Sequence, residues 1–423
     1  MPRWKLKEHK PYGGVIGVKT AAQQTAAEIY KVRDDYRRFN QKFNMIWQPN
    51  WKEEHKNHGD LQRLTSGIKR VQEQRPGFST LDWAFLSGAE ANFQGSGFPI
   101  NLANQRGNSW SPVGLGLPDG LARWEPEEAE AARLIKKMAL YFGADLTGIC
   151  KLDRRWVYSH YFNPRTNEGY PIYFSDEAPG YESVTKPGFM EDGTAVIPGS
   201  MKYAIVFLHE MDYDGMRTAP TMTQMATTHF MYSKIAFTAV SVAEFIRGLG
   251  YNAIPSANCT ALNVPLAIDA GLGQLGRHAK LISPVFGPRC RISKVITDLP
   301  LAVDRPIDFG VAAFCESCKL CAESCPVQAI PYDGPDYEPT GDFSHSKVCQ
   351  WQVKHDRCRI YWAKKGTNCG LCINRCPYNR VMGFRHRALT SLAALLPVLN
   401  KWQLRLAQPG YLEPAEFWRK LIK

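Results

Sequence analysis

The chain has 423 residues, a formal net charge of +12, 44% hydrophobic residues and 12 cysteines. Its length predicts two or three domains with a sizeable core, and its hydrophobic content excludes an intrinsically disordered chain. No apolar run reaches the ~20 residues of a membrane-spanning helix, and no apolar signal-peptide segment follows Met1, so a soluble chain is expected.

The positive charge lies at the two ends of the chain. Residues 1–60 contain 12 Lys and Arg against 7 Asp and Glu, and residues 377–423 contain 8 against 2, which leaves the middle near neutral. Basic ends can bind nucleic acid, anionic lipid or an acidic partner, or they can form a solvated surface. Nucleic acid is not expected as a partner, because no helix-turn-helix, zinc-finger or RNA-binding signature accompanies the charge.

The N-terminal third contains one expected helix and a long irregular region. The pattern of residues 20–43 predicts an amphipathic helix. Residues 75–125 are rich in Gly, Pro and Asn and are typical of loops. This third also contains four tryptophans that can either pack in a core or line a pocket: Trp47, Trp51, Trp83 and Trp110.

The middle of the chain alternates between predicted helices and strands. One helix opens at Pro126, with acidic residues at its positive N-terminal end, and a longer one begins near Thr218 and ends at glycines 248–250. A third helix is expected over residues 262–270, and strands are expected over 146–151, 204–209, 251–255, 280–283 and 291–297. This alternation predicts an α/β or α+β core, followed by a linker over 298–310.

Residues Gly271 to Gly276 match the dinucleotide pattern G-x-G-x-x-G. That fingerprint requires a strand before it and a helix after it. Here a helical stretch precedes it, and Ser283–Pro284 interrupts the segment behind it. The sequence therefore does not predict a nucleotide-binding fold at this position.

Eight of the cysteines fall between residues 315 and 376. The first run is Cys315-x2-Cys318-x2-Cys321-x3-Cys325-Pro, the bacterial pattern for a 4Fe–4S cluster. The second run, Cys369-x2-Cys372-x3-Cys376-Pro, has Gly366 where a further cysteine is needed, and the nearest upstream cysteine is Cys358. A disulfide scaffold is excluded by the long chain and the paired Cys-Pro runs, and a zinc site would need only four ligands.

These runs predict two 4Fe–4S clusters. Because the fourth cysteine of each run ligates the other cluster in two-cluster ferredoxins, the ligands are expected to cross. The first cysteine set is then Cys315, Cys318, Cys321 and Cys376, and the second cysteine set is Cys325, Cys358, Cys369 and Cys372. The other four are expected to pack as small buried residues: Cys150, Cys259, Cys290 and Cys349.

Two clusters form an electron relay, so the rest of the chain must hold a terminal acceptor or a docking surface. No haem-attachment motif, P-loop, His-Glu-x-x-His or Asp-x-His is present. About a third of the chain, from Tyr232 to Pro377, resembles the corrinoid-dependent reductive dehalogenases. The resemblance is carried by the segments 254–258 (IPSAN), 270–277 (AGLGQLGR), 283–291 (SPVFGPRCR) and 306–310 (PIDFG), together with the displaced Cys358.

The resemblance implies an α+β fold, with a nitroreductase-like corrinoid-binding core and a C-terminal ferredoxin-like module. It divides the chain into an N-terminal helical and loop region that contributes to the corrinoid and substrate pocket, the core, the module and a basic tail: 1–125, 126–305, 306–380 and 381–423. The implied cofactors are a base-off cobalamin and two 4Fe–4S clusters. The corrinoid contacts are expected at Gly271, Gly273, Ile292, Ser293, Lys294 and Trp362.

The resemblance also places the proton-donor tyrosine at Tyr232 and the supporting residues at Asn258 and Arg291. A phenol is a poor acid at neutral pH, but a nearby guanidinium stabilises the phenolate left after proton donation. Each residue has a plainer alternative. Tyr232 could be a core tyrosine, and Asn258 could form a turn before a helix. Arg291 could be a surface charge, and Trp362 could serve only to cover a cluster.

The expected reaction replaces halogen by hydrogen in a small organohalide, such as a chloromethane, chloroethane or chloroethene, using Co(I) cobalamin fed by the clusters. The alternatives are an epoxyqueuosine reductase-like enzyme and a non-enzymatic ferredoxin-like electron carrier. The expected partners are an electron donor of the respiratory chain and a small integral-membrane anchor. The expected location is the outer face of the cytoplasmic membrane after twin-arginine export, or the cytoplasm if no signal was removed before Met1. The tail, with its apolar stretch at 392–399 and Trp402, could contact the anchor or dock on its own core.

Overall fold

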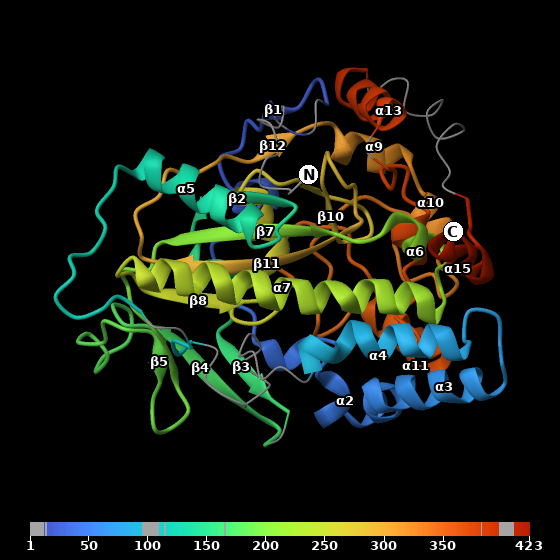
Figure 1. Ribbon diagram of the computed structural model, residues 1–423, viewed down its shortest axis with the longest axis horizontal. Coiled ribbons are helices and arrows are strands. Elements are labelled where there is room, and N and C mark those ends of the chain that lie inside the picture. Colours follow the sequence, from blue (N-terminus) through green and yellow to red (C-terminus); the bar gives the residue numbers. More distant parts are fainter. Residues whose placement is uncertain are drawn as a thin grey trace.

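A four-stranded antiparallel sheet in the order β2–β7–β11–β8 forms the centre of the computed structural model (Figure 1). The structure describes residues 12, 15–94, 110–113, 116–164, 166–381, 383–396 and 410–423. The strands of this sheet are β2 (Leu146–Lys151), β7 (Tyr203–Glu210), β11 (Cys290–Thr297) and β8 (Ala253–Ser256). Strand β11 pairs with β7 along its whole length and with β8 over its C-terminal half, so both of its edges are covered.

The period-two pattern of β7 divides the core into two layers. Ala204, Val206 and Leu208 face one hydrophobic cluster, and Ile205 and Phe207 face the other. On the second side lie α5 (Glu128–Tyr141) and the long α7 (Met222–Gly248), and Figure 1 shows α7 running across the sheet. On the first side lie α8 (Asn263–Asp269) and the short α1 (Ala26–Ile29). These elements confirm the predicted helices and strands of the middle of the chain.

A second sheet, in the order β3–β4–β6–β5, closes the first hydrophobic cluster. Its strands are β3 (His160–Asn163), β4 (Glu168–Phe174), β6 (Ala195–Ile197) and β5 (Gly188–Phe189). Two small pairs join the core to the C-terminal module: β9 (Gln274–Leu275) with β10 (Leu281–Ile282), and β1 (Lys19–Thr20) with β12 (Ile307–Asp308).

The G-x-G-x-x-G segment follows helix α8 and contains strand β9, which confirms that it is not a nucleotide fingerprint. Its glycines instead permit close approach of the chain to itself. A Cβ at Gly273 would lie 2.3 Å from the Ile282 carbonyl oxygen, and one at Gly271, where φ is +70°, would lie 2.6 Å from the Arg305 carbonyl oxygen.

The prediction of a helix over residues 20–43 was wrong. Only α1 is helical in its first half, and the chain reverses at Lys31, which has a φ of +48°. The start of α1 is fixed from outside, because the buried Asp269 carboxylate accepts a hydrogen bond from the Ala26 N–H at 2.5 Å. Tertiary contacts therefore override the local helical pattern.

The prediction of loops over residues 75–125 was also wrong, because α4 (Thr80–Gln94) occupies its first part. Helix α4 begins with a capping box in which Ser79 and Asp82 bond each other's backbone N–H groups, at 2.8 and 3.2 Å. It packs along α7, and the Ser233 hydroxyl donates to the Ala89 carbonyl at 2.7 Å. The N-terminal part of the chain also contains α2 (Gln48–Trp51), α3 (Asp60–Gln72) and short 3-10 helices at Gln41–Phe43 and Glu53–His58. A further 3-10 helix lies at Arg154–Trp156.

The C-terminal module consists of short helices around the eight cysteines. They are α9 (Val311–Ser317), α10 (Leu320–Glu323), α11 (His355–Lys365) and α12 (Leu371–Asn374), and α6 (Tyr213–Arg217) packs against α12. Helix α3 covers α11 so closely that the two backbones touch. Gly366, with a φ of +74°, could not carry a Cβ, which would lie 2.5 Å from the Gly67 nitrogen.

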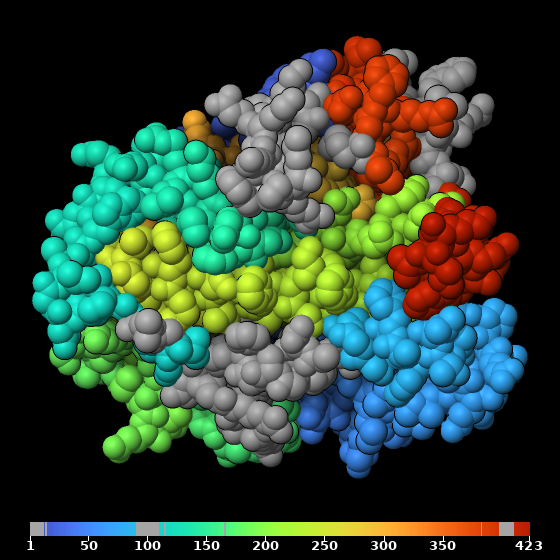
Figure 2. Space-filling view, viewed as in Figure 1, coloured from blue at the N-terminus to red at the C-terminus, as the bar shows by residue number. Residues whose placement is uncertain are grey.

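The basic tail forms α13 (Phe384–Leu395) and α15 (Pro414–Ile422), and Figure 2 shows α15 seated against the N-terminal helices. Phe417 stacks on Phe85 of α4 at a centroid distance of 6.2 Å, and Trp418 meets the same ring edge to face at 5.8 Å. Residues 397–399 and Trp402, which the sequence singled out, lie outside the described residues. Within the described part of the chain, no helix combines the length and the apolar character needed to cross a membrane.

The Asp82 carboxylate joins three segments, so its loss should destabilise the fold. It is 1% exposed and accepts hydrogen bonds from Ser79 at the start of α4, from the Thr223 hydroxyl of α7 and from the Trp418 indole of α15. Asp82→Ala should lower the free energy of unfolding by about 3 kcal/mol, because the helix loses its cap and two buried donors lose their acceptor. Chemical denaturation measures this change. The exposed Asp34→Ala is the matched control, and an equal effect of the two variants would contradict the assignment.

Candidate active site and iron–sulfur centres

Tyr232, Asn258 and Arg291 come together from three elements. Tyr232 lies on α7, half-buried among Ile235, Ala236, Val240 and Ala257. The Asn258 amide, in the loop after β8, donates to the Tyr232 hydroxyl at 3.3 Å. The Arg291 guanidinium, near the start of β11, stands over the Tyr232 ring at 5.1 Å from its centroid. A cation and an amide donor therefore flank one phenol.

His229 is a neighbour of Tyr232 that the sequence analysis missed. It precedes Tyr232 by one turn of α7, and the two rings meet edge to face with centroids 5.9 Å apart. The i,i+3 spacing on a helix would have been the signal. His229 also helps to lower the pKa of Asp60. Burial raises this pKa, but Arg63 and Arg359 lower it more strongly than His229 does.

A buried ammonium holds the loop that carries Asn258. The Lys294 Nζ donates to the carbonyls of Ala257 and Cys259, the two neighbours of Asn258, at 2.9 and 3.1 Å. Its third bond, at 2.7 Å, goes to the Asn263 side-chain oxygen, and the Asn263 amide donates to the Asn258 side-chain oxygen at 3.0 Å. Burial lowers the pKa of Lys294 to about 7, while the three acceptors favour its charged form.

This arrangement bears on the predicted corrinoid contacts. All three donors of the Lys294 ammonium are used inside the protein, so its Nζ has none left for a ligand. The close approaches at Gly271 and Gly273 are explained by the chain's own packing. Ile292 lies on the α8 side of β11, against the first hydrophobic cluster, and Ser293 lies on the opposite side.

Two buried polar atoms on the α7 side of β11 fit a polar ligand. Arg291 Nε and Ser293 Oγ are buried and have no hydrogen-bond partner within the described protein. Buried polar groups normally have partners, and a corrinoid carries amide side chains that both donate and accept. The residues present therefore fit a corrinoid, with Arg291 and Ser293 as the candidates to contact it.

The predicted aromatic residues divide into two groups. Trp362 lies on α11 one turn after Cys358, and its indole is a hydrogen-bond partner of the Cys358 thiol. The other four tryptophans contact the protein itself. Trp110 is 1% exposed beside Phe189, Trp47 packs on Phe162, Trp51 on Phe43, and Trp83 in the cluster around Phe78.

The first cysteine set is gathered in one buried layer. Cys315, Cys318 and Cys376 belong to one hydrophobic cluster. Cys321 belongs to another hydrophobic cluster but is close enough to raise the pKa of the Cys376 thiol. Burial first, and then the other thiols of this set, raise the pKa of Cys376. Such thiols keep their protons until iron binds and releases them.

The second cysteine set lies closer to the surface, where all four residues are half-buried. Burial, and then the three other thiols of the set, raise the pKa of Cys369. The two sets approach each other, because Cys321, Cys325 and Cys372 pack around Ala322 and Ile330. The eight cysteines thus adjoin one another in one module, and the crossed ligand assignment stays a prediction.

Among the described residues, no three His, Cys, Asp or Glu side chains converge on one point to hold a single metal ion. In a 4Fe–4S cubane each thiolate binds its own iron atom, so its ligands stand further apart. Cys150 and Cys259 are buried in the core as predicted, whereas Cys290 and Cys349 are only half-buried, because each lies nearer the surface than the prediction required.

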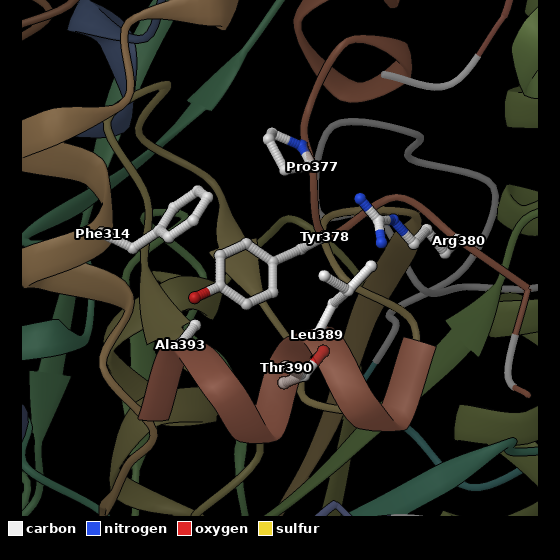
Figure 3. Close-up of a pocket in the computed structure, with 7 residues that line it drawn as sticks. All are labelled: Phe314, Pro377, Tyr378, Arg380, Leu389, Thr390 and Ala393. Carbon is white, nitrogen blue, oxygen red and sulfur yellow. The ribbon is translucent and has the colours of Figure 1, made fainter. Parts of the chain in front are cut away.

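A small pocket lies behind the first cysteine set, between the chain after Cys376 and helix α13 (Figure 3). It is lined by Phe314, Pro377, Tyr378, Arg380, Leu389, Thr390 and Ala393. Its volume of about 10 Å³ has room for about one water molecule. None of its lining residues belongs to the Tyr232 site.

The comparisons with known proteins agree with this geometry. A family model described as reductive dehalogenase subunit matches residues 55–301, and one described as 4Fe-4S double cluster binding domain matches residues 314–379. The tetrachloroethene reductive dehalogenase of Sulfurospirillum multivorans is 37% identical over 283 residues, covering 64% of this chain and 54% of the relative. That of Desulfitobacterium hafniense is 35% identical over 335 residues, covering 75% and 58%.

The chain therefore spans somewhat more than half the length of these curated relatives. Among solved structures, a reductive dehalogenase described with a mechanism for B12-dependent dehalogenation has a TM-score of 0.64 at 21% identity, covering 94% of this chain and 48% of that one. The likeness confirms the predicted fold class, a mixed helix-and-sheet core followed by a double-cluster module. The chain belongs to the reductive dehalogenases, a family of cobalamin-dependent oxidoreductases, and carries the family's double 4Fe–4S cluster domain.

Proposed function

We propose that the protein removes chlorine from a small chlorinated ethene and replaces it by hydrogen, with Tyr232 as the proton donor. The observation that carries the proposal is the meeting of Tyr232, Asn258 and Arg291 at one phenol, in a chain of this family. A chlorinated ethene is favoured over other organohalides because the curated relatives are named for tetrachloroethene and trichloroethene.

The reaction consumes two electrons and one proton and releases chloride as the carbon–chlorine bond is replaced by a carbon–hydrogen bond. A bound, reduced corrinoid supplies the electron chemistry, which the two clusters feed. The protein's part is to hold the organohalide, to exclude water and to deliver the proton from the Tyr232 hydroxyl. Ser293 and Arg291 are the residues whose unpartnered buried atoms would hold the corrinoid.

Arg291 and Asn258 make proton donation by a phenol feasible. After Tyr232 gives up its proton, the positive charge of the Arg291 guanidinium stabilises the phenolate. The Asn258 amide donates a hydrogen bond to the same oxygen, which strengthens when that oxygen becomes charged. The same cation can stabilise the departing chloride.

The partners and location remain part of the proposal. An electron donor of the respiratory chain would reduce the clusters, and a small integral-membrane protein would anchor the enzyme at the outer face of the cytoplasmic membrane. The support for these partners is the family resemblance and the basic C-terminal region.

Tyr232→Phe should lower dehalogenation by at least about 1,000-fold, because the ring stays in place while the transferable proton is lost. The measurement is chloride release from trichloroethene by holoprotein supplied with a low-potential artificial electron donor. Cobalamin and iron contents should equal those of the wild type. The exposed Tyr141→Phe is the matched control and should keep full activity. Normal turnover by a fully loaded Tyr232→Phe protein would remove Tyr232 from the role.

Lys294→Met should lower kcat by roughly 10- to 100-fold, because the loop that positions Asn258 loses two hydrogen bonds and Asn263 loses a third. Asn263→Ala should act in the same direction, and the double variant should lose less than the product of the two effects, since both residues belong to one unit. The matched control is Lys151→Met, an exposed lysine on strand β2 of the same sheet. Fully multiplicative effects would show that Lys294 and Asn263 do not act together.

A further inference from the structure

Arg277 belongs to the core in sequence but places its side chain inside the cluster module. It is 2% exposed, and it follows the glycine-rich turn after α8. Its Nε and Nη2 donate to the Cys315 carbonyl at 3.0 and 2.8 Å, and its Nε also reaches the Cys318 carbonyl at 3.2 Å. Its Nη1 donates to the carbonyls of Pro331 and Asp333 at 2.8 and 2.7 Å.

Within the described part of the chain, the Arg277 guanidinium forms no ion pair with an Asp or Glu side chain. It stands over the Trp351 ring, 5.5 Å from the ring centroid. A buried cation without a counter-ion is costly, and arginine cannot escape that cost by losing its proton. The backbone carbonyls compensate part of the cost of burying the Arg277 charge. The rest must be compensated by an anion that is buried next to Arg277.

A 4Fe–4S cluster held by four thiolates is an anion, and it becomes more negative by one charge when it takes up an electron. The carbonyls of Cys315 and Cys318 that receive the Arg277 bonds belong to two residues of the first cysteine set. A fixed cation at this place favours the reduced form over the oxidised form, because the reduced form carries the larger negative charge.

We propose that Arg277 is the buried countercharge of the cluster on the first cysteine set and raises the reduction potential of that cluster. The proposal concerns cluster occupancy and potential, so it does not depend on the chlorinated substrate or on Tyr232. The proposal also predicts different effects on the two clusters. Besides the carbonyls of the first cysteine set, the described hydrogen bonds of Arg277 go to the carbonyls of Glu316, Pro331 and Asp333, none of which belongs to the second set.

Lys280 offers a matched comparison on the same loop. Burial raises the pKa of the Cys358 thiol, in the second cysteine set, to about 11, and Lys280 acts in the opposite direction. Lys280 is only half-buried, so solvent screens its charge more than that of Arg277. A change at Lys280 should therefore have a small effect, and that effect should fall on the other cluster.

The experiment is a redox titration of the purified holoprotein without substrate, followed by electron paramagnetic resonance. The variants are Arg277→Gln, Arg277→Lys and Lys280→Gln. The signals are assigned by Cys376→Ser and Cys372→Ser, which perturb the first and the second set respectively. In Arg277→Gln the equilibrium constant for reducing the first-set cluster should fall about tenfold, which is about 59 mV for one electron. The second-set cluster should not change, and Arg277→Lys should keep most of the wild-type potential.

Every outcome decides the proposal. The titration reads only loaded molecules, so partial loss of iron does not hide a shift. Loss of the first-set cluster in Arg277→Gln, but not in Arg277→Lys, would support the need for a countercharge. Unchanged potentials in loaded Arg277→Gln would overturn the proposal. Equal shifts or equal cluster loss in both Arg277 variants would also overturn it, because the role would then be structural. Lys280→Gln should leave the first-set cluster unchanged.

Discussion

The two-residue period of β11 is the constraint on which the candidate active site depends. Arg291 and Ser293 point to the side of α7, where Arg291 covers the Tyr232 ring. Ile292 and Lys294 point to the opposite side, where Lys294 holds the loop next to Asn258. Strand β11 therefore supplies Arg291, which contacts the Tyr232 phenol, and Lys294, which holds the loop of Asn258, the other residue that contacts this phenol. A shift of register by one residue would exchange these two faces.

Two of the protein's buried basic side chains, Lys294 and Arg277, are compensated mainly by backbone carbonyls. Lys294 and Arg277 each donate to carbonyl groups of a loop that carries functional residues, and neither forms an ion pair with a carboxylate in the described structure. The two side chains differ in one respect. Burial lowers the pKa of Lys294 to about 7, so it can become neutral near physiological pH, whereas a guanidinium keeps its charge. The permanent charge lies beside the cysteines, where an electron is expected to arrive.

Sequence reasoning recovered the parts of the fold that are determined locally. Strands β2, β7 and β11 and helices α5 and α8 were found because their apolar periods match their burial. Residues 20–43 failed because contacts with Asp269 and a left-handed Lys31 determine that segment. The capping box at Ser79 was visible in the sequence and was obscured by the surrounding glycines. The crossed cysteine grouping was predicted from the spacing together with the ligation pattern of two-cluster ferredoxins. Tyr232, Asn258 and Arg291 came only from the family resemblance, and the loop support by Lys294 required the structure.

The contact between Gly67 and Gly366 explains why the second cysteine run is irregular. In a regular run the missing cysteine would stand at residue 366, yet that residue lies against the backbone of α3 and has no room for a side chain. Cys358 of α11 takes the place of this ligand in the predicted set. A side chain at residue 366 would separate α3 from α11, so the cover of the module and the irregular cysteine run depend on the same glycine.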